Sequence, residues 1–196
     1  YDIVLIGSWA LLFYKQIFDD FEPLIRTTDI DFYVPNTKAI KETNNTIETL
    51  KEINYDIIVD LLTKKSTFIS PDGFEIEFLT KLNRGSLTCV KLSNTGIYAE
   101  SLPYVDIFSN NYIDVTFGGL ILKVASPSSY VLQKLLISKA RKNKQAKDIE
   151  SVKHVLKYIK TSKKSVNELA SLFSSLPLKW QKRILRFIMK DMARFS

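Results

Sequence analysis

Two aspartates stand two positions apart in a short apolar segment, as Asp29 and Asp31 on either side of Ile30. Residues two apart on a strand point to the same side, so both carboxylates project from one face while Ile30 and Phe32 anchor the other. Two carboxylates this close repel each other unless a cation lies between them, and such oxygen pairs suit Mg²⁺ or Mn²⁺. Taken alone, the motif is weak evidence, because the exposed face of an amphipathic strand is the better interpretation of an isolated match.

A glycine-serine pair, Gly7 and Ser8, lies where an apolar segment over 2–6 meets a predicted helix over 9–18. Backbone N–H groups at the start of a helix attract phosphate, and glycine permits a close approach of the backbone. The sequence therefore predicts a phosphate-binding turn at these two residues.

Two glutamates lie on a later predicted strand, 74–79, which a Pro-Asp-Gly turn at 71–73 joins to another strand over 66–70. The apolar residues of this strand share one face, which leaves Glu75 and Glu77 together on the other. Either glutamate could supply a third carboxylate to a metal site, and strand geometry alone does not separate them.

The pattern of the remaining elements predicts an α+β region followed by helices alone. Ser126 and Pro127 mark the change, so we expect an α+β domain over 1–125 and a basic helical region over 126–196, with four helices. Further expected elements are a helix over 37–53 and strands over 29–34, 55–62, 105–108, 113–117 and 120–124.

Composition narrows the class of protein. The 196 residues are 45% hydrophobic and 25% charged, which is typical of a globular chain, and their apolar runs are too short to span a bilayer. The single cysteine, Cys89, allows no intrachain disulfide, which favours a reducing compartment and a cytoplasmic location. One cysteine and one histidine exclude the usual zinc sites.

Charge divides the chain into two parts. Residues 1–122 contain 10 Lys and Arg against 17 Asp and Glu, whereas residues 123–196 contain 18 against 4. The basic part favours a polyanionic partner such as a nucleoside triphosphate, RNA or DNA. Solvated faces of lysine-rich helices would give the same composition.

In their order along the chain, these motifs resemble the DNA polymerase beta-like nucleotidyltransferase superfamily. About 20 residues separate Ser8 from Asp29, more than is usual in that pattern, so 19–26 would form an extension. A looser match, Ser126-Pro127, Gln133 to Leu136, Arg141 and Lys147-Asp148-Ile149, resembles the helical segment of uncharacterised and toxin–antitoxin-type bacterial members. The closer matches are Leu5-Ile6-Gly7-Ser8, Thr28-Asp29-Ile30-Asp31-Phe32 and Phe74-Glu75-Ile76-Glu77-Phe78-Leu79.

The resemblance implies a mixed sheet with flanking helices and a metal-dependent reaction. Asp29 and Asp31 would hold two Mg²⁺ ions, which align an acceptor hydroxyl and bridge the phosphates of a nucleoside triphosphate. Glu77, preferred over Glu75 because it precedes a hydrophobic pair, would ligate the first metal or help to take the hydroxyl proton. Gly7 and Ser8 would grip the leaving phosphates.

The resemblance also places a basic residue on the triphosphate. Lys134 is the first candidate, with Lys139, Arg141 and Lys147 as alternates, although each has the simpler interpretation of an exposed helix residue. Asp148 could orient Lys147, or it could cap the next helix, which is the simpler interpretation.

These features favour a nucleotidyltransferase that moves a nucleoside monophosphate from a triphosphate, ATP among the candidates, to a hydroxyl. The acceptor could be RNA, tRNA in particular, a protein side chain or a small molecule, and no membrane partner is expected. The alternative is a non-catalytic module of the same fold that binds nucleic acid or protein.

Overall fold

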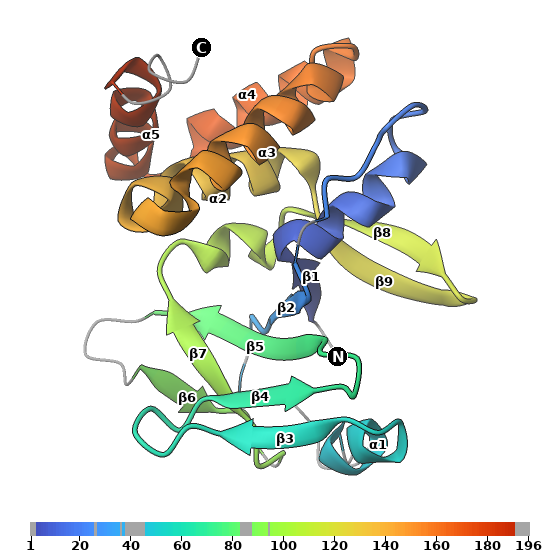
Figure 1. The fold of residues 1–196 in the computed structure, drawn as a ribbon. Helices are drawn as coiled ribbons and strands as arrows, with labels where there is room; N and C mark the ends of the chain where they lie inside the picture. The colour runs from blue at the N-terminus through green and yellow to red at the C-terminus, as the bar shows by residue number, and fades with distance from the viewer. Residues whose placement is uncertain are drawn as a thin grey trace. The chain divides into compact units, whose positions relative to one another are not determined.

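The computed structural model describes residues 3–25, 27–35, 37, 46–82, 88–93 and 95–190, with only the backbone of Lys142. The described chain divides into two compact units, shown as a ribbon in Figure 1. The first comprises Tyr1–Phe13 and Pro23–Ala125, and the second comprises Tyr14–Glu22 and Ser126–Ser196.

A mixed sheet, nine-stranded over the described residues, forms the centre of the first unit. Its main path runs β3-β4-β5-β2-β1-β9-β8, and β7 pairs with both β5 and β6. The β1·β9, β2·β5 and β5·β7 pairs are parallel, and the others are antiparallel. The strands are β1 Val4–Ile6, β2 Asp29–Tyr33, β3 Asp56–Val59, β4 Ser66–Ile69, β5 Glu75–Lys81, β6 Cys89–Lys91, β7 Tyr98–Leu102, β8 Tyr112–Phe117 and β9 Leu120–Ala125.

Strands β4 and β5 confirm the predicted hairpin, and β8 and β9 form a second one. Gly118 and Gly119 supply the turn between β8 and β9 with φ angles of 58° and 78°, which glycine adopts without a steric penalty. Strands β6 and β7 were not predicted, because their few apolar residues alternate only over short stretches.

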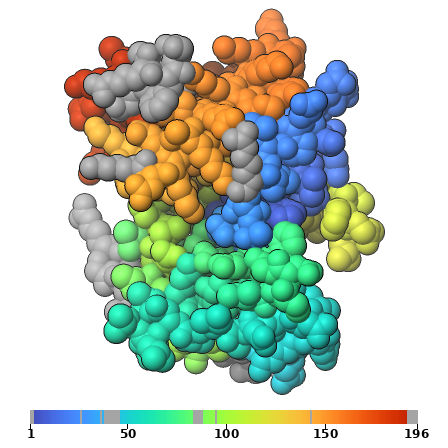
Figure 2. All heavy atoms as spheres, in the orientation of Figure 1, coloured from blue at the N-terminus to red at the C-terminus, as the bar shows by residue number. Residues whose placement is uncertain are grey.

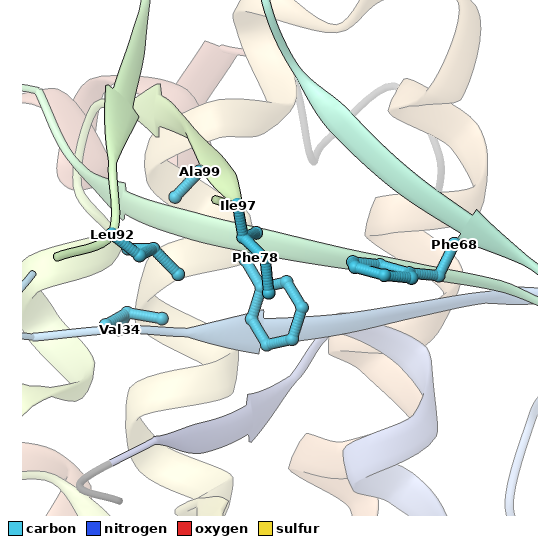
Figure 3. Packing of buried hydrophobic residues seen from close by; sticks show 6 residues of the cluster. All are labelled: Val34, Phe68, Phe78, Leu92, Ile97 and Ala99. Carbon is cyan, nitrogen blue, oxygen red and sulfur yellow. The ribbon is translucent and has the colours of Figure 1, made fainter. Parts of the chain in front are cut away.

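A hydrophobic cluster fills one side of the first unit. Phe68 of β4 and Phe78 of β5 lie in it with ring centroids 6.1 Å apart in an edge-to-face arrangement. Phe32 of β2 packs against the same cluster, so the apolar face of the Asp-Ile-Asp-Phe segment is anchored there. Figure 3 shows the buried members, Val34, Phe68, Phe78, Leu92, Ile97 and Ala99.

Three helical segments begin in the first unit: η1 Gly7–Gln16, α1 Thr46–Glu52 and η2 Val105–Ser109. The helix expected at 9–18 is thus a 3₁₀ helix. Of the helix expected at 37–53, residues 38–45 lie outside the described residues. The prediction of a strand at 105–108 was wrong. Tyr104 adopts a left-handed φ of 66°, which turns the chain, and the 3₁₀ turn η2 then buries Val105 and Phe108.

Within the described residues, four α-helices form most of the second unit, in agreement with the predicted number. Ser126 caps α2 by accepting a hydrogen bond from the Ser129 N–H at 3.2 Å, and Ser162 caps α4 in the same way at 3.3 Å from the Ser165 N–H. The helices are α2 Pro127–Ile137, α3 Gln145–Ile159, α4 Lys163–Ser175 and α5 Leu178–Lys190, with short 3₁₀ turns η3 Ser138–Ala140 and η4 Lys142–Lys144.

The segment Tyr14–Glu22 belongs to the second unit, although it lies early in the sequence. Phe21 is buried and its ring centroid lies 4.7 Å from that of Tyr158 on α3. The His154 ring nitrogen Nε2 lies 2.6 Å from the Glu22 carbonyl oxygen, and the Tyr158 hydroxyl donates to the Asp20 carbonyl. Part of the extension expected at 19–26 therefore packs on helix α3.

Across the described part of the chain, every helix is too short or too polar to cross a membrane.

Candidate active site

Four carboxylates lie on one face of the central sheet. Strands β2 and β5 are parallel neighbours (Figure 1), with Asp29 opposite Glu75 and Asp31 opposite Glu77. Paired residues of neighbouring strands point to the same face, as do residues two apart on one strand. The two acidic motifs that the sequence placed on separate strands therefore form one acidic row, defined here as Asp29, Asp31, Glu75 and Glu77.

The opposite face of the same two strands is apolar, and it fixes the row in place. Phe32 and Phe78 are paired across β2 and β5, and their rings stack with centroids 6.1 Å apart. Ile30 and Ile76 form the preceding pair. Because Phe32, Phe78 and Ile76 pack in or against the hydrophobic cluster, the intervening carboxylates must point away from it.

The glycine-serine turn lies directly against the acidic row. Strand β1 pairs with β2 so that Ile6 is opposite Asp31, and Gly7 follows at once with a φ of 68°. A Cβ atom built on Gly7 would collide with Oδ2 of Asp31 and would lie only 3.3 Å from its Cγ. Ser8 is buried at the start of η1. Glycine is thus required here both by the backbone and by the neighbouring carboxylate.

Glu77 is held by a lysine. The ammonium Nζ of Lys65 lies 2.6 Å from Oε1 of Glu77 and 3.1 Å from Oε2 of Glu100 on β7. Burial by itself would lower the pKa of Lys65, but hydrogen bonds and charge attraction from Glu77, and then from Glu100, outweigh it and raise the pKa. Lys65 therefore carries its positive charge at neutral pH.

The donor set suits a divalent cation that shares a phosphate ligand. Mg²⁺ is commonly held by one or two carboxylates together with substrate phosphates, and Asp29 and Asp31 offer two carboxylates beside the Gly7 turn. Among the described residues, no group of three His, Cys, Asp or Glu is arranged to hold a metal ion. Glu77, the third ligand that the resemblance implies, is in an ion pair with Lys65, and its assignment to a metal site stays a prediction.

The predicted triphosphate lysine lies in the second unit, within a buried ion pair. Lys134 on α2 is 8% exposed, and its Nζ donates to Oδ1 of Asp148 on α3 at 2.9 Å. The guanidinium of Arg141 lies 3.8 Å from the same oxygen. Burial raises the pKa of the neighbouring Tyr130, and Asp148 adds to that rise. The assignment of Lys134 to a triphosphate remains a prediction.

The other basic residues predicted to contact the triphosphate differ in the exposure of their side chains. Lys139 is exposed on η3, whereas Lys147 is half-buried in the first turn of α3. The expectation that Asp148 caps α3 was wrong: the N-cap position belongs to Lys144, which makes no side-chain capping bond, and Asp148 is directed to Lys134. A cavity of about 270 Å³ beside these residues is lined by Ala140, Arg141, Asn143 and Lys144.

Sequence reasoning missed two residues of the site, Lys65 and Glu100. Lys65 precedes β4 by one residue and lies two positions before Thr67, which pairs with Glu77. Side chains two positions apart on a strand point to the same face, so Lys65 could have been placed on the face of Glu77 if the register of the β4–β5 hairpin had been known. Glu100 lies on the unpredicted strand β7, so the sequence held no signal for it.

A family model described as Nucleotidyltransferase matches residues 1–173. No curated protein matched. The chain is similar to an antigenic nucleotidyltransferase-like protein from Paracoccidioides brasiliensis, with 15% identity over 93% of this chain and 83% of that one, at a TM-score of 0.44. It is also similar to the antibiotic-resistance factor ANT(2'')-Ia, with 12% identity, coverage of 88% and 82%, and a TM-score of 0.47.

Proposed function

Because the chain belongs to the nucleotidyltransferase family, we propose that it transfers a nucleoside monophosphate from a triphosphate to a hydroxyl, with Asp29 and Asp31 as the metal-binding carboxylates. The observation that supports this assignment is the close approach of Gly7 to Asp31, which brings the glycine-serine turn beside the acidic row. Both features come from the first unit.

In the proposed reaction, the acceptor oxygen forms a bond to the α-phosphorus and the bond from that phosphorus to the bridging oxygen breaks. Pyrophosphate leaves with the bonding electrons, and the hydroxyl proton passes to a base. A divalent cation, Mg²⁺ or Mn²⁺, would supply charge neutralisation on the phosphates when bound. Asp29 and Asp31 would hold that cation through their carboxylate oxygens.

The Gly7 turn would bind the phosphate end of the nucleotide. Gly7 brings the backbone close to Asp31, and the N–H groups of the first turn of η1 would act as fixed donors to phosphate oxygens. Such donors need no reorganisation as charge builds on the leaving group. Lys134, with Lys139, Arg141 and Lys147 as alternates, remains the proposed source of a cation for the triphosphate.

The charge of the basic region alone supports the choice of the first acceptor to test. Residues 123–196 contain 18 basic and 4 acidic residues, and this excess of positive charge favours a polyanion. RNA, including tRNA, is therefore the first acceptor to test. A protein side chain and a small molecule remain the other acceptors in the proposal.

One observation favours the alternative, a non-catalytic binding module. The described residues hold no three-ligand metal group, and Glu77 is neutralised by Lys65. A chain that had lost catalysis could keep the same fold and the basic helices for binding.

Incubation with each α-labelled nucleoside triphosphate, Mg²⁺ or Mn²⁺, and total RNA or cell lysate distinguishes the two functions. We expect label on an acceptor with the wild type and none with the Asp29→Asn and Asp31→Asn double variant. The matched control is Asp56→Asn with Asp114→Asn, which removes two exposed strand carboxylates outside the acidic row. Label that survives the first double variant contradicts the assigned site, and no label from the wild type under any condition favours the binding module.

A further inference from the structure

Helix α5 carries only positive charges. It has 13 residues, of which five are basic and none is acidic. By contrast, α3 contains Asp148 and Glu150, and in α4 the carboxylate of Glu168 lies 3.9 Å from the ammonium of Lys164, one turn earlier. No such pair can form within α5. Its positive charges must therefore be balanced from outside the helix.

Four of these basic residues lie along one face of α5. They are called the basic stripe here and comprise Lys179, Lys182, Arg186 and Lys190, all of them exposed. Steps of three, four and four positions keep successive members on the same face of a helix. At about 1.5 Å per residue, the stripe is about 16 Å long. Helix α5, drawn in red, lies at the surface in Figure 2.

The basic stripe meets no carboxylate in the part of the chain that the structure describes, where the salt bridges involve other residues. Like charges three or four positions apart repel each other and destabilise a helix. A polyanion on the stripe would neutralise these charges and remove the repulsion. The arrangement of the four residues therefore favours a bound polyanion.

The opposite side of α5 fixes the helix within the second unit. Ile184 and Phe187 are buried, and the helix packs against α2. The guanidinium Nε of Arg183, the fifth basic residue, donates a hydrogen bond to the Leu136 carbonyl on α2 at 2.8 Å. The basic stripe is thus presented by a helix whose orientation within the unit is fixed.

A strand of RNA fits the length and charge of the stripe. One strand of a nucleic acid duplex carries about one negative charge per 3.4 Å, so about 16 Å of strand presents about five phosphates to the four cations. An anionic membrane would also attract these cations. The apolar face of α5 formed by Ile184 and Phe187 is buried, however, and is not available to enter a bilayer.

We propose that the basic stripe binds the phosphate backbone of an RNA acceptor. The inference rests on the proposed function for the nature of this acceptor, but the binding itself needs neither nucleotide nor transfer. Because phosphates carry no sequence information, this binding is independent of the base sequence of the RNA.

Fluorescence anisotropy of a labelled single-stranded RNA of mixed sequence, titrated with the full chain at about 50 to 200 mM KCl, tests this binding without nucleoside triphosphate. The test variant combines Lys179→Gln, Lys182→Gln, Arg186→Gln and Lys190→Gln, which keep a similar helix propensity. We expect at least about tenfold weaker binding at about 100 mM KCl. The slope of log affinity against log salt concentration should become shallower by about 2 to 3, because each phosphate contact with a single strand contributes about 0.7.

A matched control removes four exposed lysines that lie outside α5, by combining Lys51→Gln, Lys91→Gln, Lys160→Gln and Lys163→Gln. Its affinity should stay within about threefold of wild type, because salt screens charges that do not contact the RNA. Thermal unfolding followed by circular dichroism tests whether each variant is folded. Should the stripe variant not fold, the pair Lys179→Gln and Lys190→Gln gives the same test with about half the change in slope.

The inference is overturned if both quadruple variants weaken binding equally, if the stripe variant keeps the wild-type slope, or if the wild type binds no RNA. Binding to vesicles of phosphatidylglycerol and phosphatidylcholine in place of RNA would likewise overturn it. The Asp29→Asn and Asp31→Asn double variant should bind RNA as the wild type does. RNA binding that depends on the stripe, without label transfer by the wild type, would count against the proposed function and not against the stripe.

Discussion

Gly7 and Asp31 lie in such close contact that the carboxylate of Asp31 occupies the space where a side chain at position 7 would begin. The two residues are 24 positions apart in the chain, and the antiparallel pairing of β1 with β2 brings them together. This relationship ties the turn that would bind phosphate to the carboxylate that would bind the metal. A change at either residue should therefore disturb both parts of the site.

Gly7→Ala should lose transfer activity beyond what its backbone strain explains. A left-handed φ costs a non-glycine residue about 1–2 kcal/mol, and the new Cβ must also displace the Asp31 carboxylate. Gly73→Ala is the matched control, because Gly73 has a φ of 80° and open space where its Cβ would lie. Urea unfolding should show similar destabilisation of both variants, while Gly7→Ala alone loses label transfer and Mn²⁺ affinity. Equal activity in the two variants would separate Gly7 from the site.

Lys134→Met should destabilise the second unit. The substitution leaves the carboxylate of Asp148 buried, with Arg141 at 3.8 Å, and breaking a buried ion pair costs about 3–5 kcal/mol. Arg141→Met is the control, since that side chain is 37% exposed and its contact with Asp148 is the longer one, so its cost should stay below about 1 kcal/mol. Urea unfolding followed by circular dichroism measures both. A small cost for Lys134→Met would leave its ammonium available for the triphosphate.

The protein should lose stability in alkali because of two buried tyrosines. Burial raises the pKa of Tyr14 well above its usual value, with a further rise from Tyr130, and burial likewise raises the pKa of Tyr130. The pKa of each tyrosine is higher in the folded chain than in the unfolded chain. The free energy of unfolding is therefore unaffected by these groups below about pH 10. As the pH rises further, it falls by up to about 1.4 kcal/mol per pH unit for each group.

Urea unfolding at a series of pH values above 9 checks that prediction. Tyr14→Phe and Tyr130→Phe should each reduce the slope of stability against pH, because phenylalanine has no proton to lose. Tyr55→Phe, at a half-exposed position, is the matched control for the loss of a tyrosine hydroxyl. Identical slopes in all of these variants would show that other groups cause the alkaline loss.

Local sequence patterns were enough to predict the parts of the site, because each part lies on one short element. Alternation placed Asp29 and Asp31 on one face of a strand and Glu75 and Glu77 on one face of another, and the Pro-Asp-Gly turn predicted the β4–β5 hairpin. The helical period predicted the number of α-helices after Ser126. These signals need only neighbours within a few positions.

Relationships between distant elements could not be predicted in the same way. The parallel pairing of β2 with β5, which joins the two acidic motifs, and the ion pair of Lys65 with Glu77 both depend on register between strands far apart in the chain. Lysine is rarely buried, so no pattern indicated that Lys134 would be covered and paired with Asp148. The 3₁₀ turn η2 follows from the backbone of Tyr104, which hydrophobic periodicity does not report.

Parallel incubations with α-labelled and γ-labelled nucleoside triphosphate, in Mg²⁺ or Mn²⁺ and with RNA as the first acceptor, test the central claim most directly. Nucleotidyl transfer by Asp29 and Asp31 predicts that the α-label joins the acceptor and that the γ-label is released in pyrophosphate. Chelation of the metal by EDTA should abolish both signals. Attachment of the γ-label would show phosphoryl transfer instead, and α-label transfer that persists in the Asp29→Asn and Asp31→Asn double variant would contradict the account.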